Sequence, residues 1–357
     1  MNPSDSFNKM TFDIPEISTS LSAELSHRID DKTKPVGSLG KLERFVHRLG
    51  MAQGTLTPSL RSPVVLVFAG DHGIATAGAS PYPQEVTMQM VLNYLRGGAA
   101  INVFVRQHGI PMRIIDAGVN AELPAHPDLI QLKVRPGTRN ALVEPALTLA
   151  EVDDCLARGA AVAQTQIAEG ADTVMLGEMG IGNTAVSALL VSALLDLPIE
   201  DCVGRGAGHD DAGLRRKHKL CAEIKARHGV ITGGREALAA YGGCEIAMMV
   251  GAMLATAAAR KLVVVDGFIA TAAAVVASRI NPRVLDYCVF SHASAESGHA
   301  RVVKALGVEP FVDLGLRLGE ATGAVLVWPL LQSATAFLSE MATFSSAGVT
   351  ESSAGRN

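Results

Sequence analysis

The chain has 357 residues, of which 48% are hydrophobic and only 4% aromatic, and it is rich in glycine. This apolar content excludes an intrinsically disordered protein, and the length suffices for one large α/β domain with an appendage, or for two domains. The net charge of −4 is spread along the chain, and no basic run is interleaved with aromatic residues, which argues against a nucleic-acid-binding protein.

The cysteines, the N-terminal residues and the apolar runs indicate the cellular compartment. The cysteines stand singly and without a C-x-x-C pair, so we expect buried free thiols in a reducing cytoplasm. The first 15 residues are mostly polar and show no signal peptide. The most apolar runs, 246–259 and 324–331, are shorter than the roughly 20 residues of a membrane span. We therefore expect a soluble, cytoplasmic protein with no membrane partner.

Apolar runs typical of buried strands alternate with segments of helical spacing along most of the chain. Residues 14–60 are predicted to be helical and polar, with Ser38 or Gly40 opening a helix over 41–51. The predicted strands are 64–68, 113–116, 172–176, 262–265 and 286–290. The predicted helices are 84–95, 99–107, 149–169, 185–195, 243–260, 268–278 and 321–343. This alternation predicts an α/β fold with a parallel sheet and helices on both faces.

Polar motifs follow the ends of the predicted strands, and the ligands of such sheets bind at those carboxyl ends. The glycine-rich turn 177–184 could cradle an anion at a helix N-terminus, or it could be a tight βα turn without a ligand. Its Glu178 is better placed against a sugar hydroxyl than against a phosphate. In a second glycine-rich loop, 204–211, alternating glycines allow a ligand to approach closely. Lys217 follows it, either as a phosphate-binding charge or on a solvated basic helix face.

Three more motifs carry polar side chains, each with a plainer alternative. Asp266 could bind a ligand or cap the following helix. Ser291 and Ser294 could donate to phosphate oxygens or act as caps. Glu320 lies at the predicted start of the C-terminal helix, where the dipole favours a carboxylate and apolar neighbours raise its pKa, so it could serve as a base or only as a first-turn residue. No H-x-x-x-H or H-E-x-x-H pair is present, and we expect no metal.

Several of these motifs, in this order, resemble the nicotinate-nucleotide–dimethylbenzimidazole phosphoribosyltransferases, which assemble the lower-ligand nucleotide of cobalamin. The similarity runs from Lys34 to Phe344. The matching stretches are 34–40, 70–73, 80–81 with 86–87, 177–184, 204–206, 266–268, 291–296 and 317–320.

The resemblance implies that Glu320 is the general base and that the acceptor-base pocket includes Ser80 and Gln89. Together with the motifs, it places the remaining substrate contacts at Glu178, Gly180, Gly182, Asn183, Gly204, Gly206, Lys217, Asp266, Gly267, Ser291 and Ser294. The implied substrates are nicotinate mononucleotide and a benzimidazole base, with no cofactor. The alternatives are a phosphoribosyltransferase that uses a purine or phenol acceptor, and a non-catalytic nucleotide-binding module.

The resemblance also implies a Rossmann-like parallel sheet with a smaller helical domain formed from both ends of the chain. We assign residues 60–320 to the catalytic domain, 1–59 with 321–345 to the helical domain, and 346–357 to a loose tail. A homodimer is expected.

Overall fold

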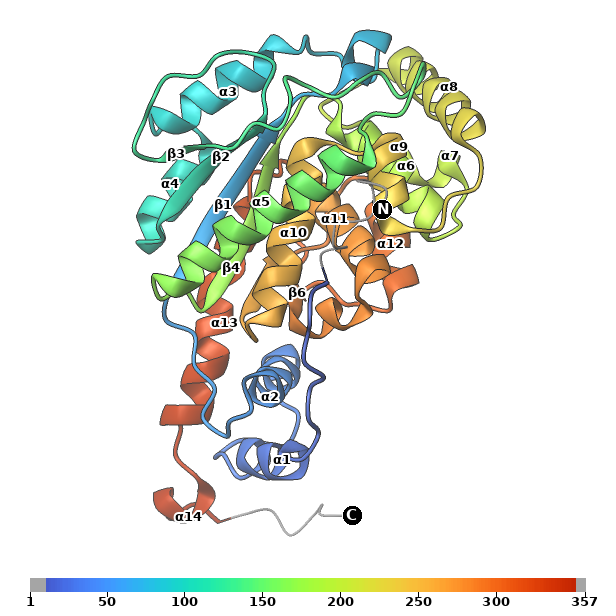
Figure 1. The fold of residues 1–357 in the computed structure, drawn as a ribbon. Coiled ribbons are helices and arrows are strands. Elements are labelled where there is room, and N and C mark those ends of the chain that lie inside the picture. The colour runs from blue at the N-terminus through green and yellow to red at the C-terminus, as the bar shows by residue number, and fades with distance from the viewer. Residues whose placement is uncertain (1–10, 351–357) are drawn as a thin grey trace, which may run out of the picture. The chain divides into compact units, whose positions relative to one another are not determined.

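The computed structural model describes residues 11–350, which form two compact units (Figure 1). The larger unit comprises residues 11–15 and 62–326. The smaller unit comprises residues 16–61 and 327–350. Each unit is made from segments that are distant in the sequence.

Within the described residues of the larger unit, six parallel strands form one sheet in the order β3-β2-β1-β4-β5-β6. Their bounds are Pro63–Gly70 (β1), Met112–Gly118 (β2), Leu129–Gln131 (β3), Thr173–Met179 (β4), Leu262–Val265 (β5) and Cys288–Phe290 (β6). The central strands β1 and β4 are buried along nearly their whole length, as unbroken apolar runs require. This strand order is that of a Rossmann fold, and it reverses between β1 and β4, where a crevice opens at the carboxyl ends. The predicted fold class is confirmed.

Helices cover the sheet on both faces (Figure 1). In the larger unit they are Glu85–Leu95 (α3), Ala100–His108 (α4), Leu149–Ala168 (α5), Asn183–Leu194 (α6), Ile199–Cys202 (α7), Asp211–His228 (α8), Gly234–Tyr241 (α9), Cys244–Ala258 (α10), Phe268–Ile280 (α11) and His299–Leu306 (α12), with short 3₁₀ helices at Gly73–Ala77 and Pro282–Tyr287. Helices α5 and α10 pack backbone to backbone. A Cβ added at Gly159 would lie 1.9 Å from the Met248 carbonyl oxygen, and one at Gly251 would lie 2.1 Å from that of Leu156. The abundance of small residues thus has a packing cause.

The smaller unit is helical, as predicted. It contains Ser22–Asp30 (α1), Lys41–Gln53 (α2), the later part of Thr322–Glu340 (α13) and Phe344–Ala347 (α14). Gly40 precedes α2 with a φ of 54°, so it is the residue that opens the predicted helix. The Lys32 ammonium donates to the Met341 carbonyl at 2.8 Å and ties the two chain segments together. The predicted loose tail starts too early, because Thr343 caps α14 and Ser346 lies within that helix; residues 351–357 lie outside the described part.

Two expectations concern the protein interior. All five cysteines are buried free thiols. Among the described helices, α13 is long and apolar enough to cross a membrane by length and composition, but 56% of its most apolar window is buried inside the structure. A core helix of a globular protein meets the same criteria.

Candidate active site

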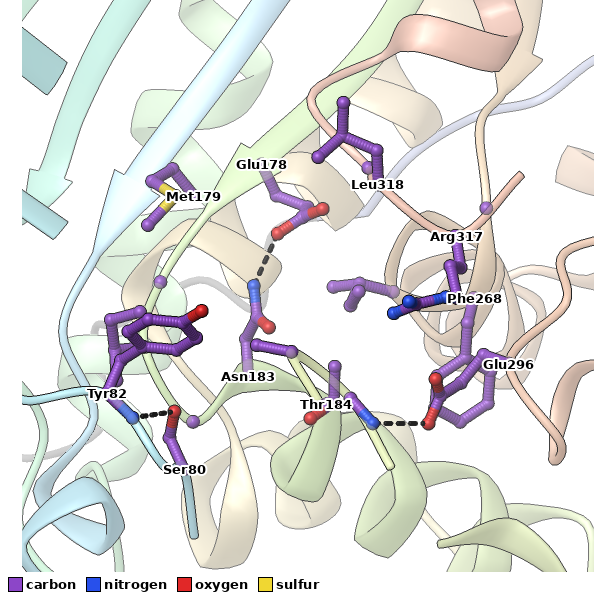
Figure 2. A pocket seen from close by; sticks show the side chains of 18 of the residues that line it. Ser80, Tyr82, Glu178, Met179, Asn183, Thr184, Phe268, Glu296, Arg317 and Leu318 are labelled. Atoms are coloured by element: carbon purple, nitrogen blue, oxygen red, sulfur yellow. Dashed lines mark hydrogen bonds between the residues drawn. The ribbon is translucent and has the colours of Figure 1, made fainter. Parts of the chain in front are cut away.

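A cavity of about 470 Å³ lies within the larger unit, at the carboxyl ends of its strands (Figure 2). Loops that follow β1, β4, β5 and β6 line it, together with the segment that leads into α13. The lining residues are 79–82, Val86, Met90, 178–184, 206–207, His209, 267–269, His292, Ser294, Glu296 and 317–320. The crevice that the strand order predicts is therefore an actual cavity.

Most of the predicted site residues meet in this cavity. Those that line it are Ser80, Glu178, Gly180, Gly182, Asn183, Gly206, Gly267, Ser294 and Glu320. They come from segments up to 240 positions apart in the sequence, between Ser80 and Glu320. Those that do not line it are Gly204, Lys217, Asp266, Ser291 and Gln89. Of these, all but Gln89 are buried directly behind the lining.

Lys217 is fully buried, so the solvated-face alternative is wrong for this residue, although Arg215 and Arg216 are exposed. Its ammonium donates to Thr184 Oγ1 at 2.8 Å and to the Gly204 carbonyl at 3.0 Å. It therefore joins the two glycine-rich turns from behind. Burial lowers the pKa of Lys217, and the nearby Glu296 carboxylate opposes that effect.

Asp266 and Ser291 act on the backbone near the start of α13. Asp266 Oδ1 accepts the Ala324 N–H at 3.0 Å, so Asp266 caps α13 and not α11, the helix that follows it in the sequence. The Ser291 hydroxyl donates to the Asp266 carbonyl at 3.2 Å. Burial raises the pKa of Asp266, and the neighbouring His292 opposes this rise. These residues shape the wall that carries Glu320.

The structure does not bring Gln89 to the cavity. Its side chain is exposed on α3, whereas Val86 and Met90, four positions apart on the same helix, face the lining. Successive residues of an α-helix point roughly 100° apart, so Gln89 does not share the direction of its neighbour Met90.

Glu320 lines the cavity but is only 5% exposed. Glu320 and Ala321 both have left-handed φ values, 63° and 68°, a conformation that is rare for residues other than glycine. Burial raises the pKa of the Glu320 carboxyl, and the Tyr94 hydroxyl and the Ile101 N–H, at the first turn of α4, oppose the rise. Oε2 has no hydrogen-bond partner in the described part of the chain. This buried oxygen therefore has unused capacity to accept a hydrogen bond or a proton.

Glu178 is another buried carboxyl of the cavity, and its Oε2 accepts a hydrogen bond from the Asn183 amide (Figure 2). Burial, followed by the charges of Asp266 and Glu245, raises its pKa to about 8. At neutral pH the folded protein therefore keeps Glu178 mostly protonated, and its hydroxyl can donate to a ligand oxygen.

The comparisons with known proteins agree with this geometry. A family model described as phosphoribosyltransferase matches residues 14–349. Nicotinate-nucleotide–dimethylbenzimidazole phosphoribosyltransferases from Cupriavidus taiwanensis and Dechloromonas aromatica are 52% and 51% identical, each over 96% of this chain and 99% of the relative. The chain belongs to this family. The crystal structure of CobT from Thermus thermophilus is similar at a TM-score of 0.90 and 45% identity, over 93% of this chain and 99% of that one.

The phosphoribosyltransferase family membership confirms the resemblance seen in the motifs, and the structure adds cavity residues to which the sequence analysis assigned no substrate contact. They are Tyr82, Thr184, His209, Phe268, Glu296, Arg317 and Leu318. Six of them are shown in Figure 2. Several stand inside or beside the quoted motifs, so the signal that could have found them was adjacency to a motif. Adjacency to a motif does not indicate whether a side chain points into the cavity.

For this phosphoribosyltransferase we expect Glu178→Gln to change the pH dependence of stability. The folded protein holds the Glu178 proton up to about pH 8, whereas an ordinary glutamate releases it near 4.5. Between these two pH values the unfolded chain therefore binds fewer protons than the folded protein. The free energy of unfolding falls as pH rises through this range, by at most about 1.4 kcal/mol per pH unit. The variant lacks this contribution, so its stability relative to wild type should grow between pH 5.5 and 7.5.

Urea unfolding of both proteins at the two pH values measures this change. Glu24→Gln, on an exposed part of α1, is the matched control and should show no such trend. A stability difference between Glu178→Gln and wild type that is the same at both pH values would contradict the prediction.

Proposed function

We propose that this enzyme transfers the 5-phosphoribosyl group of nicotinate mononucleotide to 5,6-dimethylbenzimidazole, giving alpha-ribazole 5′-phosphate and nicotinate. The observation that carries the proposal is Glu320, a buried carboxyl with a raised pKa and an unpartnered oxygen in the wall of the cavity. Family membership supplies the substrate pair, and this carboxyl supplies the base that the acceptor requires.

The chemistry divides the work between donor and acceptor. When the C1′–N bond of the donor breaks, the electron pair goes to the pyridinium nitrogen, which leaves uncharged and requires no proton. One ring nitrogen of the acceptor forms the new bond to C1′, and the other loses its proton to Glu320. An alpha product from a beta donor requires attack from the face opposite the leaving group. A positioned base contributes roughly 10²–10⁴ to such a step.

The remaining predicted residues are proposed to bind and orient the donor. Gly206 and Ser294 line the cavity where the 5′-phosphate is expected, with Lys217 behind them. The protonated Glu178 is proposed to donate to a ribose hydroxyl. Ser80 lies beside Tyr82, whose N–H donates to the Ser80 hydroxyl at 3.2 Å (Figure 2), and this side is proposed for the acceptor base. Holding both substrates in line contributes through orientation.

The larger assembly follows from the same resemblance. We propose that the larger unit, residues 11–15 and 62–326, is the catalytic domain and that the smaller unit, 16–61 and 327–350, is the helical domain. The bounds expected from the sequence, 60–320 for the one and 1–59 with 321–345 for the other, differ from these units mainly at residues 11–15 and 321–326. We further propose a cytoplasmic homodimer without nucleic-acid or membrane partners. The relatives are named for a phosphoribosyltransferase that acts on a nucleotide and a base, which supports small-molecule substrates.

Release of nicotinate tests the proposed function. Purified enzyme given nicotinate mononucleotide should release nicotinate only when a base is added, and it should form one phosphoribosylated base per nicotinate. A panel of benzimidazoles, purines and phenols with this single donor ranks the acceptors. Release without any acceptor indicates a hydrolase, turnover with purines alone indicates another transferase, and binding without release indicates a nucleotide-binding module.

We also predict that activity survives exhaustive chelation. The donor already carries a positive charge on its leaving group, so the departure of that group requires no Lewis acid. Turnover should therefore be equal before and after EDTA treatment and desalting. Loss of turnover that one divalent ion restores would contradict the prediction.

A further inference from the structure

One anion-binding arrangement in the cavity already holds a carboxylate of the protein itself. Glu296 Oε1 accepts the Gly206 N–H at 3.0 Å, and the Glu296 side chain is 8% exposed (Figure 2). The same oxygen lies against Gly204, where an added Cβ would be 1.8 Å from it. The absence of a side chain at Gly204 therefore makes room for the Glu296 carboxylate.

The buried ammonium of Lys217 lies beside the same glycine-rich loop. Its ammonium has three N–H donors, and Thr184 Oγ1 and the Gly204 carbonyl accept two of them. Both acceptors are neutral, and the Glu296 carboxylate is the strongest electrostatic influence that opposes the effect of burial on the pKa of Lys217. A backbone N–H on a glycine loop next to a buried ammonium is an arrangement suited to a phosphate.

We infer that the Glu296 carboxylate occupies the phosphate site of the free enzyme. There it accepts the Gly206 N–H and lies on the side of Lys217, until a phosphomonoester displaces the carboxylate. This inference rests on the proposed function, because it takes the 5′-phosphate of the donor as the displacing group. A carboxylate left beside a bound phosphate would repel it, so the Glu296 side chain has to move.

Arg317 gives the displaced carboxylate a partner. It lines the same cavity, is exposed, and makes no ion pair or side-chain hydrogen bond with the described residues. Figure 2 shows Arg317 and Glu296 on one side of the cavity. The internal carboxylate therefore sets the affinity for phosphate-bearing ligands, and it leaves affinity for ligands without a phosphate unchanged.

Glu296→Gln tests the inference, because the amide oxygen can still accept the Gly206 N–H while the charge is gone. The variant should bind nicotinate mononucleotide and inorganic phosphate roughly tenfold more tightly than wild type, since a like-charge contact has been removed. Affinity for nicotinate riboside, which lacks the phosphate, should stay within about twofold of wild type. Titration calorimetry without any acceptor base measures all three affinities.

Glu200→Gln is the matched control, because it removes an exposed carboxylate on α7 that is not part of the cavity lining. Its three affinities should equal those of wild type. Equal or weaker binding of the phosphate-bearing ligands by Glu296→Gln would overturn the inference, and so would an equal gain for the riboside.

A crystal structure of the wild-type enzyme with nicotinate mononucleotide keeps the inference testable if the variant does not fold. Glu296 Oε1 should have left the Gly206 N–H, with a phosphate oxygen in its place. A phosphate bound elsewhere, with the Glu296–Gly206 hydrogen bond intact, would overturn the inference. Wild-type turnover with dimethylbenzimidazole, assayed in the same preparation, tests the proposed function separately.

Discussion

Replacing Glu320 with glutamine should lower kcat by roughly 10²–10⁴, the usual contribution of a positioned general base. Glutamine keeps the shape of the side chain but cannot take the acceptor proton. Both substrates should still bind, because most of the proposed contacts come from other loops of the cavity. Steady-state rates with dimethylbenzimidazole, together with separate titrations of each substrate, measure the two effects.

Two readouts separate a base from a helix-start residue. Burial raises the pKa of Glu320, so wild-type activity should fall as pH drops through that raised value, and the variant should lack this acid limb. The substitution should also lower kcat less when the acceptor is a benzimidazole that loses its proton more easily. Glu24→Gln, in the first turn of α1, is the control for a role limited to the helix dipole. A kcat of Glu320→Gln within a few-fold of the wild-type value would mean that Glu320 serves only the start of the helix.

The sequence predicted the elements that have the strongest hydrophobic pattern. The run 64–68 became β1, and 262–265 was predicted with the bounds that β5 has in the structure, because buried parallel strands need continuous apolar residues. The strand β3 was missed, since three residues paired to β2 carry no periodicity. Helix α8 was recognised only as a basic run, because its sequence is mostly polar.

For the site, the sequence located the loops but not the direction of each side chain. In the motif that begins at Asp266, the following glycine lines the cavity, whereas the aspartate turns behind it to cap α13. Lys217 likewise reaches the site from behind the glycine-rich turns. Which neighbour faces the ligand depends on long-range packing, and no local pattern encodes it. The contact between Glu296 and Gly206 joins residues 90 positions apart and was invisible for the same reason.

Replacing Gly177 with alanine should lower kcat by about 10², although Gly177 touches no substrate. A Cβ at this position of β4 would lie 2.6 Å from the Glu320 carbonyl carbon and 2.7 Å from the Ala321 nitrogen. These are backbone atoms of two residues in the left-handed conformation, so no flexible side chain can move aside. Restoring an ordinary contact requires a displacement of roughly 0.8 Å, and a shift of about 1 Å at a reacting group is enough for such a loss.

A double variant decides whether the loss acts through Glu320. If Gly177→Ala only displaces the base, it should have little further effect on an enzyme that already carries Glu320→Gln, because residues that act as a unit are not additive. Gly251→Ala is the matched control, since its Cβ would also meet a backbone oxygen, that of Leu156 at 2.1 Å, in a helix contact away from the cavity. That control should lose stability and keep kcat once rates are corrected for the folded fraction. The same hundredfold loss with and without the carboxylate at position 320 would mean that Gly177 supports the enzyme by another route.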